Sequence, residues 1–258
     1  MKLLKEIWNY REMIYSLVRR DIRGRYKGSV LGVLWVLVDP LCQLVIYTLV
    51  FSFILPSGID KFYLFLFVAL VPWIFFNQCM TGGSTIILAN QDMIKKIYFP
   101  REIIPISYTI STLVNMLLSF IAVFVVVIVS GTRLSPVGLL FLPLVILDEF
   151  FLSLGMIMLT CGINVYFRDV QYILNVISLG WMYLTPILYP RTLIPDPYNQ
   201  LFYFNPLTVI IESYRDILYY GQMPDIRKLM LSVLCSLVIM LIGFYCFGHL
   251  KKHFAEEL

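Results

Sequence analysis

Long apolar runs alternate with short polar segments along most of this chain. Each run is about 19 to 29 residues long, and none of them alternates strictly between apolar and polar positions. An α-helix needs about 20 apolar residues to cross the hydrocarbon core of a bilayer, whereas a β-barrel strand is a short alternating segment. The pattern therefore predicts an all-α integral membrane protein with six transmembrane helices, at residues 33–55, 62–88, 103–130, 137–165, 172–190 and 229–249.

The first 28 residues follow a different pattern. Their apolar residues recur at steps of three and four: Leu3, Leu4, Ile7, Trp8, Ile14, Leu17, Val18 and Ile22. Basic residues occupy positions between them: Lys5, Arg11, Arg19, Arg20 and Arg23. This arrangement is typical of an amphipathic helix that lies in the membrane surface, with its basic side chains near anionic headgroups. We expect such a helix over residues 1–28, where it either serves only as an anchor or also contacts a partner.

Three glycines separate this helix from the first predicted span. Gly24, Gly28 and Gly32 are spaced by four residues. Small residues at this spacing let two helix backbones approach closely. The run is only partly apolar, so the glycines predict either a close helix contact or a bend before the first span.

The segment 191–228 is the longest polar segment between two predicted spans. Within it, Asn205 is a good N-cap, Pro206 suits the first helical turn, and Gly221 is a natural C-terminal stop. The helix between them has about 14 residues, too few to cross a bilayer. Its expected apolar face holds Leu207, Ile210, Ile211, Tyr214 and Leu218, and its expected polar face holds Glu212, Arg215 and Asp216. We therefore expect a re-entrant helical hairpin before the last span, with irregular backbone that protein or a water-filled path must cover.

Composition and charge agree with one transmembrane domain over residues 1–258. The chain is 60% hydrophobic and 14% charged, whereas soluble domains are nearer half apolar and a quarter charged. Spans one to five occupy 33–190 and span six occupies 229–249, so both termini lie on the same side. Placing that side in the cytoplasm puts 14 of the 20 Lys and Arg residues inside, as the positive-inside rule favours. The net charge of +4 is too unevenly spread to indicate nucleic-acid binding.

Catalytic and nucleotide-binding motifs are absent from the sequence. It holds no Gly-x-x-x-x-Gly-Lys-Ser/Thr loop and no Ser/His/Asp set. The two histidines, His249 and His253, have no third metal ligand nearby, and the five cysteines all lie in apolar runs. We therefore expect no catalytic residue, no metal and no cofactor on this chain, which disfavours a membrane-embedded transferase and leaves a transporter or a membrane scaffold.

The charged stretch Asn90–Glu102, "NQDMIKKIYFPRE", interrupts two apolar runs on the predicted cytoplasmic side. Asp92 comes early and Lys95 and Lys96 come late in two possible helical turns, which matches the helix dipole. Ile94, Ile97 and Tyr98 are expected to form an apolar edge. A short helix held between two spans can transmit a push from a soluble partner. The alternative is a positively charged cytoplasmic loop with no partner.

Five motifs carry a resemblance to a known family: "RYKGSVLGVLW", "IKKIYFPREIIP", "INVYFRDV", "TPILYP" and "FNPLTVIIESYRDIL". In this order they resemble the membrane subunits of ABC type-2 exporters, and more narrowly the permeases for O-antigen, teichoic acid and similar surface polysaccharides. The resemblance runs from about Arg19 to the C-terminus. It departs from the family pattern at Asp39, where an uncharged amide is common before Pro40, and at the acidic pair Asp148–Glu149.

The resemblance implies a homodimer with six spans per subunit, paired with two copies of a separate ATPase subunit that binds ATP and Mg. It implies that the N-terminal helix is an interface helix and that 190–221 forms re-entrant helices at the pore mouth. It also implies that the charged stretch is a coupling helix seated on the ATPase. The residues assigned to this coupling are Asp92, Ile94, Lys95, Lys96, Ile97, Tyr98, Arg101 and Glu102.

Aromatic residues make up 16% of the chain and bear on the substrate. Aromatic faces can pack on the C–H faces of sugars, which suits a sliding polymer, but an interfacial belt or core packing is the alternative. The candidates for a pore or substrate path are Trp73, Phe76, Trp181, Tyr183, Tyr189, Tyr203, Phe204 and Tyr214.

Taken with these patterns, the resemblance implies the transmembrane subunit of an exporter in the cytoplasmic membrane of a bacterium, with a lipid-linked polysaccharide as substrate. A permease for drugs or another lipid-like molecule is the alternative of the same type. The acidic pair inside span four raises a separate question, because charges inside a membrane are expensive and face protein or water. Since neighbouring residues are about 100° apart on a helix, we expect Asp148 and Glu149 to lie in different environments, one beside a polar partner within the bundle and the other beside water or a neighbouring helix. The alternatives are a proton relay and a span that places both acids near the outer interface.

Overall fold

The computed structural model describes residues 2–54, 58–195, 198, 202 and 204–254, and every regular element in them is a helix. Five helical stretches are long and apolar enough to cross a membrane: Gly32–Ser52, Phe62–Ala89, Ile103–Val129, Pro136–Tyr166 and Ile226–His253. These match the first four predicted spans and the sixth, which confirms the all-α membrane fold. The fifth predicted span corresponds to α9 (Val170–Leu184), which has only 15 residues.

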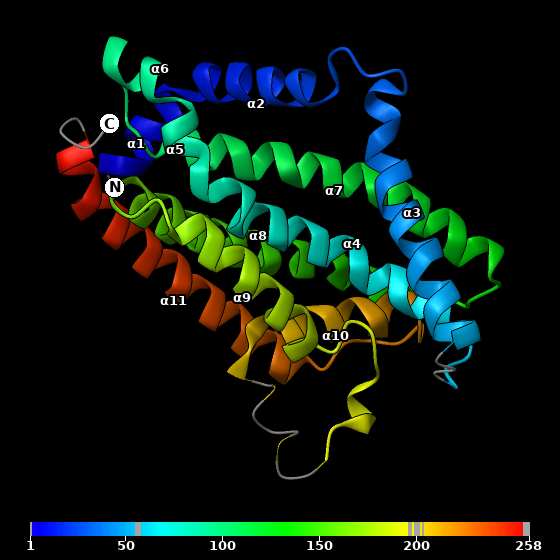
Figure 1. The fold of residues 1–258 in the computed structure, drawn as a ribbon. Helices are drawn as coiled ribbons and strands as arrows, with labels where there is room; N and C mark the ends of the chain where they lie inside the picture. Colours follow the sequence, from blue (N-terminus) through cyan, green and yellow to red (C-terminus); the bar gives the residue numbers. More distant parts are fainter. Residues whose placement is uncertain (1, 55–57, 196–197, 199–201, 203, 255–258) are drawn as a thin grey trace.

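Residues 2–26 form two helices, whereas one helix was predicted over residues 1–28. Helix α1 (Lys2–Asn9) ends before Tyr10, and α2 (Arg11–Tyr26) then packs along α7 (Ile103–Val129) (Figure 1). The break lets Ile7 of α1 and Leu17 of α2 pack against the same buried cluster from two directions. A bend follows α2, because Gly28 and Gly32 adopt positive φ values of 83° and 52° that favour glycine.

Span one begins after this bend and crosses the bundle at an angle to α4 and α7 (Figure 1). It consists of η1 (Gly32–Leu34), α3 (Trp35–Leu49) and a π-helical end, η2 (Val50–Ile54). Ser119 of α7 donates a hydrogen bond of 2.9 Å to the carbonyl oxygen of Val36, which fixes the start of α3 on α7.

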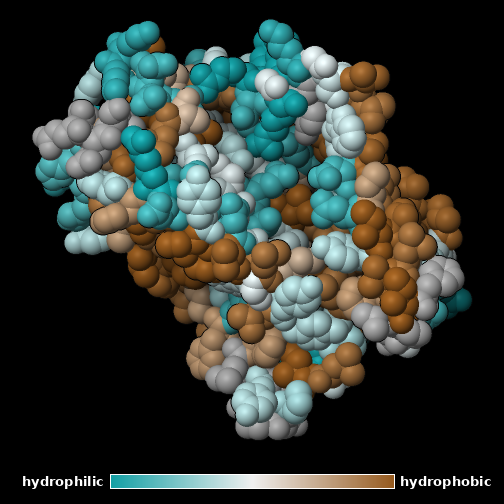
Figure 2. Space-filling view, viewed as in Figure 1, coloured by the Kyte–Doolittle hydropathy of each residue, from teal (hydrophilic) through white to brown (hydrophobic). Residues whose placement is uncertain are grey.

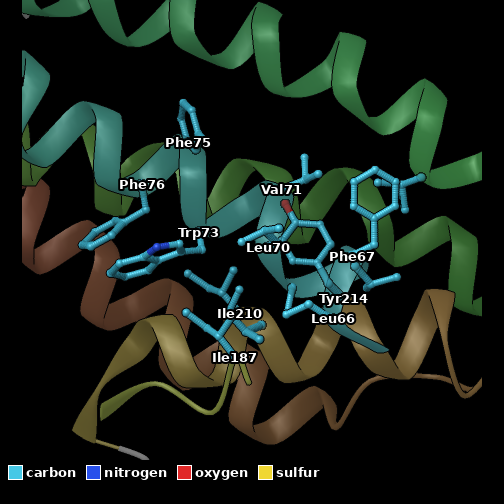
Figure 3. Packing of buried hydrophobic residues seen from close by; sticks show 14 of the residues in the cluster. Leu66, Phe67, Leu70, Val71, Trp73, Phe75, Phe76, Ile187, Ile210 and Tyr214 are labelled. Carbon is cyan, nitrogen blue, oxygen red and sulfur yellow. The ribbon is translucent and has the colours of Figure 1, made fainter. Parts of the chain in front are cut away.

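Helix α4 (Phe62–Met80) is the centre of the bundle, surrounded by α3, α7, α8 and α10. It is apolar on every side, as expected for a helix enclosed by protein, and its residues Leu64–Val71 are all buried. Figure 3 shows Tyr214, which comes from α10, lying among Leu66, Leu70 and other side chains of α4.

Helices α8 (Pro136–Tyr166) and α11 (Ile226–Leu250) pack backbone to backbone where two glycines meet. A Cβ atom added to Gly155 would lie 2.7 Å from the backbone of Met240, and one added to Gly243 would lie 2.5 Å from the carbonyl oxygen of Gly155. No side chain fits at either position, so this contact requires glycine on both helices.

Helix α10 (Pro206–Leu218) begins and ends at the predicted signals. The Asn205 side chain accepts a hydrogen bond of 3.2 Å from the backbone N–H of Leu207, Pro206 occupies the first turn, and Gly221 follows with a φ of 66°. The helix packs against α4, α8 and α11 and does not lie on the surface. A short turn, η4 (Arg191–Leu193), is part of the chain between α9 and α10.

The two ends of the bundle differ in content. One end carries α1, α2 and the segment η3 (Gly82–Thr85), α5 (Ile86–Ala89) and α6 (Gln91–Lys96), and the last turns of α11 lie near it (Figure 1). The other end carries α10 and the turn before α8. Hydrophobic side chains cover α3 and α9 (Figure 2). Hydrophilic side chains gather over α2 and over the part of the bundle that lies between α3 and α9 (Figure 2).

Candidate functional site

The charged stretch between spans two and three forms a short helix with an exposed tip. Helix α6 ends at Lys96, and Ile97 continues in extended backbone with φ −129° and ψ 134°. Ile97 is 57% exposed and Tyr98 is 95% exposed, so two large apolar side chains project from this end of the bundle. Ile94 instead turns inward and packs against the buried cluster below. The predicted apolar edge thus contains Ile97 and Tyr98, with Ile94 supporting the helix from beneath.

The five charged candidates of this stretch divide into two groups. Asp92, Lys95 and Lys96 are exposed on α6, with the acid in its first turn and the bases in its last. Glu102 is 1% exposed and forms an ion pair with the Lys251 ammonium, and Arg101 donates to the backbone carbonyl of Lys251. Arg101 and Glu102 therefore bind the C-terminal end of α11.

Helix α6 is also joined to α2, because Arg20 donates a hydrogen bond of 2.6 Å to the side chain of Asn90. A force on the tip can therefore pass directly into three elements: α7 through the chain, α2 through Asn90, and α11 through Glu102. An ion pair between residues so far apart in sequence gives no local signal, so sequence reasoning assigned Glu102 to the partner contact.

The aromatic candidates for a substrate path lie in two different environments. Trp73, Phe76 and Tyr214 are buried in the core of the single chain, whereas Tyr183 is 61% exposed and Phe204 is 83% exposed. Trp181 and Tyr189 are half-buried, and Tyr203 lies outside the described residues. The first three are buried because α4 and α10 are enclosed on several sides. Trp181 connects the two groups, with its ring centroid 5.4 Å from that of Phe76.

An open cavity of about 990 Å³ lies between α9 and the chain that precedes α10. Four aromatic side chains contribute to its wall: Trp181, Tyr198, Phe202 and Phe204. The Trp181 indole N–H donates to the side-chain oxygen of Asn205 at 3.3 Å, so the α10 cap also orients this ring. Sequence reasoning missed Tyr198 and Phe202, although their position in the same proline-rich segment as Phe204 was the available signal.

Arg215, which was predicted on the polar face of the short helix, is buried. It is 3% exposed, and its guanidinium lies 3.5 Å from the ring centroid of Phe65. Its N–H groups donate to the carbonyl oxygens of Phe65 at 3.3 Å and Ile187 at 2.6 Å, and to that of Pro186. The chain beyond α9 thereby has hydrogen-bond partners for the carbonyls that no helix satisfies.

These features are those of a membrane bundle with an exposed contact point, the α6 tip, at one end. At the other end two short helices, α9 and α10, are separated by irregular chain. Among the described residues, no group of three or more His, Cys, Asp or Glu could hold a metal ion. The model of the ABC-2 type transporter family matches residues 12–219, most of the chain. The chain belongs to the ABC-2 type transporter family.

Three relatives with named functions are similar to this chain over most of its length. The O-antigen export system permease protein RfbA of Myxococcus xanthus is 32% identical over the whole of both chains. The protein of the same name from Klebsiella pneumoniae is 29% identical over 96% of this chain and 95% of its own. The polysialic acid transport protein KpsM of Escherichia coli is 25% identical over 89% of this chain and 90% of its own.

This ABC-2 family chain holds two buried carboxylates in α8, and each has its own partner. Asp148 accepts a hydrogen bond of 2.7 Å from Ser232 of α11, and Glu149 accepts one of 2.7 Å from Tyr214 of α10. Both side chains are 0% exposed. The second oxygen of each carboxylate has no hydrogen-bond partner among the described residues. The expectation that the two neighbours do not share one environment is confirmed, since each has a polar partner on a different neighbouring helix, and the pair joins α8 to both α10 and α11.

Replacing Glu149 by Gln is expected to leave the melting temperature in detergent unchanged or raised, because the amide oxygen can still accept from Tyr214 and no charge is buried. Replacing Tyr214 by Phe should lower stability by about 1–3 kcal/mol, because a buried acceptor loses its donor. Thermal unfolding of the two purified variants tests this difference. A Gln variant that folds and hydrolyses ATP with its partner but exports nothing would instead place the carboxylate in the transport path.

Proposed function

We propose that this chain is the membrane-spanning subunit of an ATP-driven exporter that moves a lipid-linked surface polysaccharide across the cytoplasmic membrane of a bacterium. The observation that carries the proposal is its match to an O-antigen export permease over the full length of both chains. O-antigen, teichoic acid and capsule-like polymers form the proposed substrate class, and the likeness to a polysialic acid transport protein supports a capsule-like member.

The proposed partner is a separate ATPase, present in two copies, that binds ATP and Mg. Its contact point is the exposed tip formed by α6, Ile97 and Tyr98, because two exposed apolar side chains beside charged residues are suited to a protein groove. Nucleotide-driven movement of the ATPase would push this tip, and the links to α2, α7 and α11 would carry the motion into the membrane.

We propose that two copies of the chain enclose the pathway, with both termini in the cytoplasm. The surface of α9 is consistent with this dimer, because large apolar side chains are exposed along the helix. They include Tyr172, Ile173, Val176 and Tyr183. Such a face is covered by lipid or by another subunit. The concentration of Lys and Arg at the end that carries α1, α2 and α6 supports the cytoplasmic placement.

The aromatic cavity beside α9 and α10 is proposed as the external end of the path. Its rings can pack on sugar C–H faces, and the Asn205 amide offers a polar contact within the same wall. A permease for drugs or another lipid-like molecule is the alternative.

A cysteine in place of Phe204 is expected to react with a membrane-impermeant maleimide added outside intact cells. Phe204 is 83% exposed in the proposed external segment, and the five native cysteines are first replaced by alanine. Cysteine in place of Tyr214 is the matched control, because that position is buried and should stay unlabelled. Labelling of residue 204 only from the cytoplasmic side would reverse the proposed topology.

The proposed function is tested by deleting the gene and restoring it on a plasmid. Loss of polymer from the cell surface, its accumulation inside, and full restoration by the wild-type chain are expected. Purification of the tagged chain should also yield an ATPase whose turnover rises with the lipid-linked polymer. Normal surface polymer in the deletion strain would overturn the proposal.

A further inference from the structure

A polar cavity lies at the opposite end of α10 from the aromatic cavity. It is open, has a volume of about 370 Å³, and occurs where the last turns of α10 meet the chain after α9 and the start of α11. It shares no lining residue with the aromatic cavity, and its volume is within the range of small-molecule binding sites. The polar side chains of its lining that bear on a ligand are Arg191, Glu212, Asp216, Tyr220, Gln222 and Lys228.

The polar groups of this cavity are accessible, so a ligand can reach them. Tyr220 is 55% exposed, and Gln222 is also exposed. The side chains of Arg191 and Glu212 are 19% and 24% exposed, and that of Lys228 is 42% exposed. Donors and acceptors are therefore both presented at the surface of the cavity.

The mixed charges of the lining favour a ligand that carries hydroxyl groups. Arg191 pairs with Glu212 at 3.3 Å, and Lys228 pairs at 3.4 Å with Asp225 in the loop before α11. A free anion would meet the carboxylates of Glu212 and Asp216, and a metal cation would meet the positive charges of Arg191 and Lys228. A neutral polyhydroxyl compound meets neither repulsion, because each hydroxyl both donates and accepts.

The two carboxyl groups have fewer stabilising partners than their burial requires. Burial raises the pKa of Glu212, although the nearby charges of Arg191 and Lys228 lower it. Burial also raises the pKa of Asp216, although a hydrogen bond of 2.8 Å from Gln222 lowers it. A carboxylate can accept about four hydrogen bonds, so hydroxyl donors from a ligand would stabilise both groups.

Tyr220 supplies an aromatic ring that the protein holds in place at the rim. Its ring makes an edge-to-face contact with that of Tyr219 at a centroid distance of 4.8 Å, and the Tyr219 hydroxyl donates to the carbonyl oxygen of Asp60 at 2.6 Å. The next residue, Gly221, has a φ of 66°, and a side chain there would clash with the carbonyl oxygen of Arg133. The ring is therefore positioned before any ligand arrives, which lowers the entropic cost of binding.

We infer that this cavity is a saccharide subsite at the external end of the export path. The carboxylates of Glu212 and Asp216 accept hydrogen bonds from sugar hydroxyls, Arg191 and Lys228 donate to sugar oxygens, and the ring of Tyr220 packs on a C–H face of the sugar. The inference rests on the proposed function and gives the emerging polymer a contact beyond the aromatic cavity.

The test measures binding of oligosaccharide fragments of the strain's surface polymer to the purified chain in nanodiscs by isothermal titration. Tyr220→Ala should weaken binding by about fivefold, whereas Tyr220→Trp keeps a ring and should stay within about twofold of wild type. Met223→Ala is the matched control, because Met223 is exposed in the same loop but does not line the cavity. Absence of binding to the wild-type chain, or an unchanged affinity in the Ala variant, would overturn the inference.

Acceptor chemistry and stability separate a ligand contact from a structural role. Asp216→Leu removes the acceptor and should weaken binding by about fivefold, whereas Asp216→Asn keeps one and should stay within about threefold of wild type. The melting temperatures of both variants should stay within about 3 °C of wild type, because Asp216 is only half-buried. A lower melting temperature with a proportionate loss of binding would assign Asp216 a structural role and overturn its part in the subsite.

A direct contact in cells is tested by placing the photoreactive residue p-benzoylphenylalanine at position 220. After irradiation of exporting cells, the purified chain should carry periodate–Schiff-stainable glycan, and the same residue at the exposed position 231 of α11 should carry none. Glycan at both positions or at neither, or cross-linking of position 220 to phospholipid alone, would overturn the inference. Failure of the wild-type chain to restore surface polymer to the deletion strain would instead refute the proposed function, so the two failures are distinguishable.

Discussion

Replacing Arg215 by Met is expected to lower the melting temperature of the purified protein in detergent by on the order of 10 °C. Met fills similar space but donates no hydrogen bond, so the carbonyls of Phe65, Pro186 and Ile187 lose their shared donor. An unsatisfied buried polar group costs about 1–3 kcal/mol. Removal of the buried charge offsets part of that sum, which leaves a net loss of about 3 kcal/mol.

Two further variants show whether the loss comes from the hydrogen bonds. Arg215→Lys keeps the charge but not the planar set of donors, so its melting temperature should lie between those of Arg215→Met and the wild-type protein. Arg191→Met is the matched control, because this arginine pairs with Glu212 at 3.3 Å in a partly exposed position and should contribute about 1 kcal/mol or less. Equal losses at positions 191 and 215 would contradict the role given to the buried guanidinium.

Replacing both Ile97 and Tyr98 by Asp is expected to abolish export. These two side chains are the exposed apolar residues of the tip, and buried apolar anchors usually contribute about 2 kcal/mol or more each to an interface. Loss of both should weaken ATPase binding by on the order of 100-fold or more, because every 1.4 kcal/mol is a factor of ten. Co-purification of the ATPase and ATP turnover in proteoliposomes measure the two possible failures, dissociation and uncoupling.

Tyr98→Phe and Lys96→Ala serve as controls for this double variant. The first keeps the ring and the second removes only an exposed charge, so both should retain export within about threefold, in line with the small energies of rim contacts. The double variant should keep its melting temperature, since neither side chain packs in the core. Coupled transport at the wild-type rate in the Asp variant would remove the tip from the proposed interface.

The spans and helix ends were predictable from the sequence because their causes are local. A run of apolar residues predicts a crossing helix by itself, and Asn205, Pro206 and Gly221 act on residues within one turn of them. The exposed tip at Ile97 and Tyr98 was predictable for the same reason, since Pro100 and the neighbouring charges exclude a continuous apolar helix there.

Other features depend on contacts that no local pattern contains. Glu102 pairs with Lys251 across 149 positions, and Arg215 turns inward because α4, α8 and α11 leave α10 little free surface. Trp73 and Phe76 were assigned to the path from residue type alone, whereas the enclosure of α4 makes them core residues in the single chain. Whether a residue on a short helix faces water or protein is decided by the number of neighbouring helices, which the sequence of that helix does not state.

The Arg215 side chain, which donates hydrogen bonds to the carbonyls beyond α9, is synthesised after those carbonyls. Helix α9 has 15 residues, too few to cross a bilayer alone, and the Arg215 groups that bind the chain beyond it lie 28 and 29 residues after Ile187 and Pro186. When α9 leaves the ribosome, the carbonyls at its end therefore have no partner from this arginine. These carbonyls therefore gain the Arg215 donor only after α10 has been translated and has packed against α4 and α8.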